Sequence, residues 1–126
     1  MDIQSAVERH ETAIKALRML QEIENITPQN AEGHILKAFI LERGTEGAAG
    51  KANAIGLRMP GKTAAGPRRY ISTDITAIVA ATSDEKADER LVFLAKGLYA
   101  MKRHRKSWQS KLESLCDEYV KRYGKE

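Results

Sequence analysis

The feature that most constrains the fold is a regular spacing of apolar side chains towards the end of the chain. Nine positions follow one another at alternating intervals of three and four residues, and eight of them are apolar or aromatic. These positions are Leu91, Leu94, Leu98, Met101, Arg105, Trp108, Leu112, Leu115 and Tyr119. A heptad pattern of this length predicts an amphipathic helical segment from about Ser83 to Tyr123 that packs against another helix.

Two features interrupt this segment. Gly97 weakens a helix by roughly 1 kcal/mol relative to Ala, and it predicts a close helix crossing or a bend. Arg105 occupies a position where a coiled coil needs an apolar residue, within the basic run 102–106. The segment is therefore either one helix with a basic collar or two shorter helices joined there. Only the single helix would give an uninterrupted seam between two copies.

Apolar spacing also predicts two helices in the first third of the chain. Asp2 is a favourable N-cap for the first helix, which extends to about residue 24. Its apolar stripe consists of Ile3, Val7, His10, Ile14, Leu17 and Leu20 or Gln21. Thr27 and Pro28 predict the start of a second helix, over about 28–43. Arg43 followed by Gly44 is a typical helix ending, with Gly as the left-handed cap.

The middle of the chain has a different composition. Residues 44–70 hold six of the nine glycines and two of the three prolines, and Glu46 is their only acidic residue. A short helix around 46–55 is compatible with its alanines. Residues 56–69 predict a loop or a short hairpin.

Helical signals return after Tyr70. Ser72 or Thr73 can cap a short helix, and Asp74 complements its positive N-terminus. Thr82 and Glu85 are three residues apart, as in a capping box at the start of the C-terminal segment.

These patterns predict an all-α fold of four to five helices. A chain of 126 residues is expected to form one domain with one modest core. Within it, residues 1–43 give the N-terminal helices, 44–70 a basic Gly-rich loop region and 71–126 the C-terminal helices. The stripe of the first helix and the C-terminal seam pack on each other, on a second copy, or both. Their combined apolar area favours a homodimer.

Charge is distributed in alternating blocks. The formal net charge is +4. Residues 31–70 carry 7 basic and 3 acidic side chains, and residues 102–126 carry 8 and 4, so each block is +4. The two remaining blocks are each −2, with 3 basic and 5 acidic side chains. Two basic stretches on a small domain fit an anionic partner such as nucleic acid, although a solubilising surface would have the same composition.

Several function classes are disfavoured. The single cysteine, Cys116, excludes an intramolecular disulfide, and the three histidines, His10, His34 and His104, have no partners at metal-ligand spacing. No carboxylate pair stands out as an acid and base. We therefore expect no enzyme activity, no metal and no cofactor. Without a secretion signal or an apolar run of membrane-spanning length, a cytoplasmic location is expected.

One segment matches a nucleotide-binding pattern. Residues 56–63, Gly-Leu-Arg-Met-Pro-Gly-Lys-Thr, have the glycine and Lys-Thr spacing of a phosphate-binding P-loop. A P-loop follows a buried strand and precedes a helix, whereas here Ala-rich sequence comes before the pattern and Gly66-Pro67 soon after it. The segment is better interpreted as a basic loop that contacts phosphate.

Residues 52–79 carry a second resemblance. Ala-Asn-Ala-Ile-Gly-Leu-Arg-Met-Pro at 52–60, a basic spacer, and Arg-Tyr-Ile-Ser-Thr-Asp-Ile from residue 69 resemble the DNA-binding, helix-turn-helix-like region of large serine recombinases and related phage and plasmid proteins. In that region a helix ends in an Asn-containing turn, and a basic loop leads to an aromatic residue and a helix that lies on DNA. The resemblance covers 28 residues and includes no catalytic domain. A generic Gly/Pro loop between two helices is the alternative.

The resemblance implies a set of nucleic-acid-binding residues. Arg58, Lys62, Arg68 and Arg69 would face phosphates, and Ser72, Thr73 and Thr76 would lie at the start of a helix presented to a groove. Tyr70 would stack on a base or, preferably, anchor the loop to the core. Independently of the resemblance, Lys102, Arg103, Arg105 and Lys106 form a second basic group that could contact a phosphate backbone.

The expected function is that of a DNA-binding regulator or accessory protein of phage or plasmid type, acting as a homodimer, with RNA as a possible ligand. The alternative is a protein–protein adaptor or inhibitor that docks on a host or partner protein through its helical seam. A small nucleotide-dependent enzyme is a third hypothesis that depends on the P-loop pattern alone.

Overall fold

The computed structural model describes residues 2–60, 66–102 and 106–124. Within these residues the chain forms six α-helices and no strand, so the predicted all-α class is confirmed. The helices are α1 (Ile3–Glu24), α2 (Ala31–Leu41), α3 (Thr45–Ala54), α4 (Ser72–Ala81), α5 (Glu89–Ala100) and α6 (Trp108–Tyr123). The number exceeds the predicted four to five because α3 forms and the C-terminal segment divides into two helices. None of the described helices is long and apolar enough to cross a membrane.

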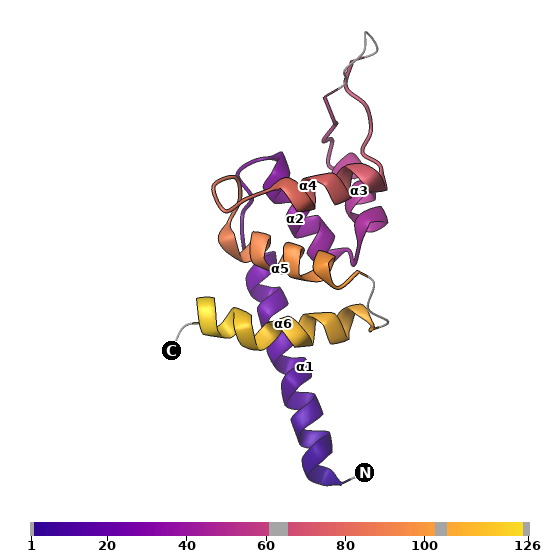
Figure 1. Cartoon of the computed structure of the whole chain (residues 1–126). Helices are drawn as coiled ribbons and strands as arrows, with labels where there is room; N and C mark the ends of the chain where they lie inside the picture. The colour runs from indigo at the N-terminus through magenta and orange to yellow at the C-terminus, as the bar shows by residue number, and fades with distance from the viewer. Residues whose placement is uncertain (1, 61–65, 103–105, 125–126) are drawn as a thin grey trace.

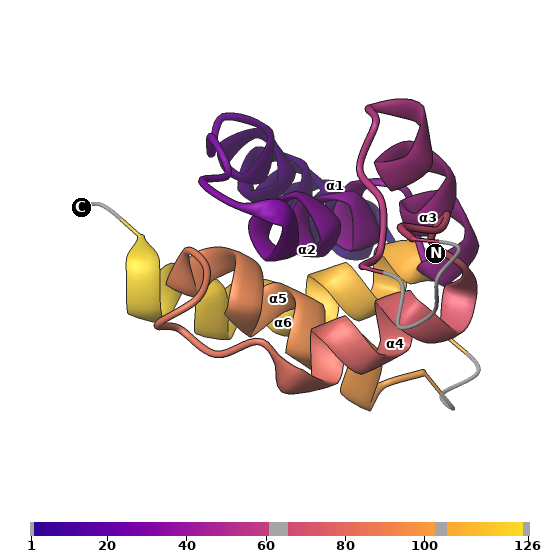
Figure 2. The same cartoon turned by 90° about the horizontal axis from the view of Figure 1, so that it is seen from above.

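The helices are arranged in two layers. Figure 1 shows α4, α5 and α6 stacked in front, and Figure 2 shows α1, α2 and α3 lying behind them. Contacts between α2 and α5, α3 and α4, and α1 and α6 join the layers. One continuous core fills the space between them and draws on all six helices.

The C-terminal segment is a helical hairpin. Helix α5 ends at the C-cap Met101, and α6 begins after Ser107, whose side chain accepts a hydrogen bond from Ser110 N–H. The two helices run antiparallel and pack on each other (Figure 1). The predicted seam is buried within the chain, because its leucines and Tyr119 lie in the core. It is therefore not available as a seam between two copies.

Gly97 lies at a close contact between α5 and α6, so the close crossing is the alternative observed at this glycine. A Cβ atom added to Gly97 would lie 2.8 Å from Cδ2 of Leu115. The nearby Trp108 then attaches α6 to α2. Its Nε1–H donates to the Ile40 carbonyl at 3.1 Å, and its ring meets Phe39 edge-on with centroids 5.5 Å apart.

Helix α1 extends well beyond the two layers. Its first half projects past α6 into solvent, whereas Ala16, Met19 and Ile23 in its second half are buried (Figure 1). The predicted N-cap is confirmed, because Asp2 accepts from Ser5 N–H at 2.7 Å. The predicted apolar stripe does not pack against the C-terminal helices of its own chain.

The ends of α2 differ from the prediction. Thr27 and Pro28 do not open α2, because Asn30 is the N-cap and accepts from Gly33 N–H at 2.8 Å. Asn30 also donates to the Lys86 carbonyl at 2.6 Å, a tertiary bond that Thr27 would not make. At the other end of α2, Arg43 already adopts the left-handed conformation, with φ 63°, and Gly44 follows it with φ 139°.

The capping box predicted at Thr82 and Glu85 does not form. Thr82 is the C-cap of α4, and its hydroxyl donates to the Ile78 carbonyl at 2.7 Å. Helix α5 begins later, after Asp88, whose carboxylate accepts from Arg90 N–H. Helix α4 also begins one residue earlier than predicted, because Ile71 is its N-cap.

Candidate nucleic-acid interface

A projecting segment connects α3 to α4. We call its described residues, 55–60 and 66–71, the arm. Figure 1 shows the arm leaving the helical layers at the end of the molecule opposite the start of α1. Its two sides are joined by an antiparallel bridge in which Met59 and Arg68 exchange backbone hydrogen bonds of 2.8 and 2.9 Å. Residues 56–69 were predicted to form a loop or a short hairpin, and their described part forms the hairpin.

The base of the arm is fixed by Asn53, near the end of α3. The Asn53 side chain accepts from Tyr70 N–H at 2.8 Å and donates to the Tyr70 carbonyl at 3.0 Å. This pair of bonds satisfies both backbone groups of Tyr70, whose side chain is buried in the core. Tyr70 thus has the anchoring role that we preferred over base stacking.

The alternation of side chains across the bridge gives the arm two faces. Leu57, Met59, Arg68 and Tyr70 share the inner face, and the three apolar side chains among them contact the core. Arg58 and Arg69 adjoin the bridged pair, one on each side of the arm, and the same alternation assigns them to its outer face. Both are exposed.

Arg68 is engaged within the chain. Its guanidinium makes two hydrogen bonds to the Asp74 carboxylate, at 2.7 and 2.8 Å. The same carboxylate accepts from Ile71 N–H at 2.9 Å and so holds the start of α4. The Arg68 guanidinium, assisted by this N–H group, keeps the pKa of Asp74 below its ordinary value, so the pair remains charged. Arg68 therefore stabilises the base of the arm.

Among the described residues, neither Arg58 nor Arg69 has such a neutralising partner. Arg58 donates to the carbonyls of Leu57 and Asn53, at 2.7 and 3.1 Å, which orders its guanidinium without compensating its charge. Arg69 forms no ion pair with any residue that the structure describes. Each guanidinium therefore keeps a positive charge and N–H donors for an anion from outside the chain.

The hydroxyl residues predicted at the start of α4 differ in availability. Thr73 is exposed and Ser72 is half-buried, and both lie in the first turn next to the arm. The Thr76 hydroxyl donates to the Ser72 carbonyl at 3.3 Å, so its donor is occupied within the helix. Thr73 is the most accessible of the three for an outside partner.

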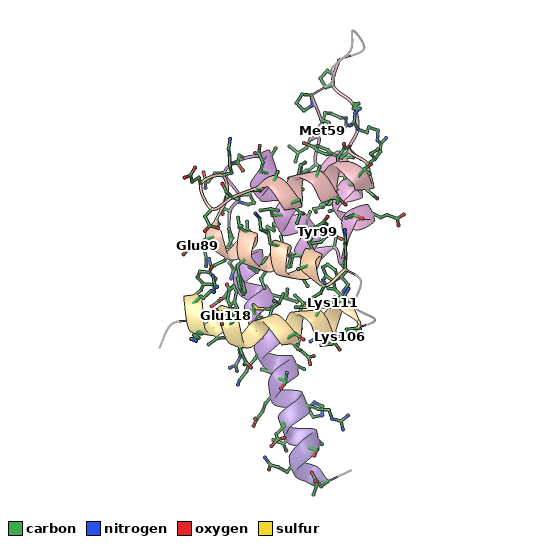
Figure 3. The ribbon with its side chains drawn as sticks, viewed as in Figure 1. Met59, Glu89, Tyr99, Lys106, Lys111 and Glu118 are labelled. Atoms are coloured by element: carbon green, nitrogen blue, oxygen red, sulfur yellow. The ribbon has the colours of Figure 1, made fainter. Side chains whose placement is uncertain are left out.

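The second basic group lies elsewhere. Figure 3 places Met59 on the arm and Lys106 beside the start of α6, with α4 and α5 between them. Lys102 lies over the Tyr99 ring, 4.4 Å from its centroid, and its Nζ donates to the Tyr99 hydroxyl. The fold does not bring these two lysines to the arm. Three predicted residues, Lys62, Arg103 and Arg105, lie outside the described part of the chain.

The other candidate chemistry finds little support in the geometry. The P-loop pattern follows helix α3 instead of the buried strand that such a loop requires. Cys116 is buried, and this burial raises the pKa of its thiol, as expected for a packed cysteine. Among residues 2–60, 66–102 and 106–124, no group of three or more His, Cys, Asp or Glu side chains could hold a metal ion.

Sequence reasoning missed the two contacts that hold the arm in place. Asn53 and Tyr70 are 17 residues apart, and Arg68 and Asp74 are six apart, so neither spacing is a helical signature. The Asn-containing turn in the recombinase resemblance marked the position of Asn53 without indicating its partner.

No protein-family model, no curated protein and no solved structure matches the chain.

Proposed function

We propose that this chain binds nucleic acid, with DNA as the first candidate, through the outer face of the arm. The observation that supports it best is the exposure of Arg58 and Arg69, one on each side of a projecting antiparallel arm, without an acidic partner among the described residues. Two-stranded ribbons and arms of this kind enter DNA grooves in known complexes, and arginine is the preferred donor to phosphate.

The surroundings of the arm fit the same role. Helices α2 and α3 are joined by the three residues Glu42, Arg43 and Gly44, a connection as short as that of helix-turn-helix motifs. The arm follows directly after α3. The proposed relation to the DNA-binding region of serine recombinases and related phage and plasmid proteins would account for this order of elements. In this proposal the protein is a regulator or accessory factor that acts as a homodimer.

A gel-shift series with random-sequence duplex DNA and RNA at increasing salt tests the proposal. The test variant is Arg58→Ala with Arg69→Ala, and the control is Lys96→Ala with Lys121→Ala, which removes the same charge from exposed positions on α5 and α6. Loss of two phosphate contacts should lower the slope of log affinity against log salt by about two. The control should leave this slope unchanged.

Equal affinities and slopes for the two double variants would mean that the arm makes no specific contribution, and would overturn the proposal. Arg68 is left intact in this experiment because its removal would disturb the arm through Asp74. A protein without measurable affinity for DNA or RNA at low salt would favour the adaptor alternative. Because the helical seam predicted for that adaptor is buried, the exposed apolar side chains of α1 would have to serve as its docking surface.

A further inference from the structure

Helix α1 exposes a row of apolar side chains that runs from its projecting half into its second half. The exposed fractions are 83% for Ile3, 42% for Val7, 46% for Ile14 and 54% for Leu17. With His10 between Val7 and Ile14, the intervals are four, three, four and three, the spacing of a coiled-coil face. These five residues are the α1 stripe.

The side of α1 that packs in the chain is a different one. Ala16, Met19 and Ile23 are buried, and Met19 lies beside Tyr119 of α6. At about 100° per residue, these positions lie on the side of the helix opposite the α1 stripe. A second helix can therefore pack on the stripe while α6 stays in place.

The stripe leads into a hollow between α1 and the end of α2. Its volume is about 450 Å³, and its apolar lining consists of Ile14, Leu17, Leu20 and Leu41. Arg18, Gln21 and Glu24 complete its lining. The hollow continues the stripe beyond Leu17. A second helix that packs on the stripe can therefore insert the side chains at its own end into the hollow.

The area available is sufficient for a dimer. The chain exposes 8374 Å², whereas a compact monomer of 14.0 kDa exposes about 6,700 Å². The projecting arm and the projecting part of α1 share this excess, and a standard interface buries roughly 800 Å² on each partner. Residues 3–17 alone would overlap over about 22 Å, or two heptads, which is short for a coiled coil in water. The hollow supplies the remaining contact.

We propose that the occupant is a second copy of this chain, which places its own α1 antiparallel on the stripe. In this register Val7 packs against Leu17 of the second copy, His10 against Ile14, and Ile3 enters the hollow. An antiparallel arrangement is favoured because each projecting end then fills the other chain's hollow, whereas parallel helices would leave both hollows empty. The inference deepens the proposed function by assigning the surface through which its homodimer forms.

Sedimentation equilibrium of the full chain without DNA tests this assignment. The wild type should have a mass of about 28 kDa, twice 14.0 kDa, at 10–100 µM. Ile14→Glu with Leu17→Glu should weaken association at least 100-fold and keep the helical circular dichroism. Val120→Glu, at an exposed position on α6, is the matched control and should remain dimeric. Ile3→Glu, far from the core, gives a milder variant should the double one fail to fold, and should weaken association about tenfold.

The orientation has its own test. Ala13 lies close to the proposed two-fold axis, so Ala13→Cys should be linked to itself by a short bismaleimide. Ile3→Cys should not, because the two copies of residue 3 lie at opposite ends. Cys116 is buried, and the wild type is therefore a suitable background.

A wild type that is monomeric at 100 µM, or a dimer that survives the glutamate substitutions, would overturn the proposal. Efficient linkage of Ile3→Cys would overturn the antiparallel arrangement. Capture of a different protein by the stripe of a monomeric chain would favour the adaptor. The arm variant Arg58→Ala with Arg69→Ala should remain dimeric, so failure of the dimer and failure of DNA binding are distinguishable.

Discussion

Asn53 provides the sharpest test of how the arm is held. Asn53→Ala removes the acceptor at 2.8 Å from Tyr70 N–H and the donor at 3.0 Å to the Tyr70 carbonyl. A net hydrogen bond contributes about 0.5–1.5 kcal/mol, so losing two should lower the free energy of unfolding by about 1–3 kcal/mol. The upper part of this range applies if water does not reach the two orphaned backbone groups.

Urea unfolding followed by circular dichroism gives this free energy. The matched control is Asn25→Ala, which truncates an exposed asparagine at the end of α1 and should change stability by less than about 0.5 kcal/mol. Amide hydrogen exchange should also accelerate at Met59 and Arg68, whose bridge depends on the fixed base. If Asn53→Ala were as stable as the control and the bridge amides kept their protection, the described locking of the arm would be refuted.

Three further outcomes follow from contacts in the core and at the start of α4. Because the folded-state pKa of Asp74 lies below 3.8, its pairing with Arg68 stabilises the chain above that pH, and the stability advantage over Asp74→Asn in urea titrations should vanish as the pH falls below about 4. Gly97→Val should cost about 1–3 kcal/mol by overpacking against Leu115, and an unchanged urea midpoint would argue against the close helix approach. Trp108→Phe should cost about 1–3 kcal/mol by leaving a buried carbonyl of α2 without its donor, measured by thermal melting with Trp108→Ala as the more severe comparison.

The sequence predicted the helical elements better than their partners. Asp2 capped α1, Gly97 marked a close approach, and Tyr70 joined the core, because each of these roles follows from local chemistry. The heptad positions, in contrast, become buried in either of two ways. Residues 83–123 can form one helix that packs on another helix, or two helices that pack on each other. Periodicity alone therefore could not locate the break after Met101 or show that the seam is satisfied within the chain.

The position of the arm was predicted better than the contacts of its arginines. A basic segment between two helices was evident from composition. Arg68 looked equivalent to Arg58 and Arg69 in the sequence, yet only Arg68 lies on the inner face, where Asp74 is within reach. Which arginine is engaged depends on the register of the bridge with Met59, and that register is set by the anchoring of the arm at Asn53.

The arm and the free half of α1 lie at opposite ends of the molecule (Figure 1). In an antiparallel dimer the two arms would consequently point away from each other, and two adjacent half-sites on one face of a duplex would be out of reach of the pair. Such a dimer would link two separate duplexes, or it would hold two distant sites of one duplex together and so form a DNA loop. DNA compaction by the protein would then be greatest at an intermediate ratio of protein to DNA, and it would decline at protein excess, when every duplex segment carries its own dimer.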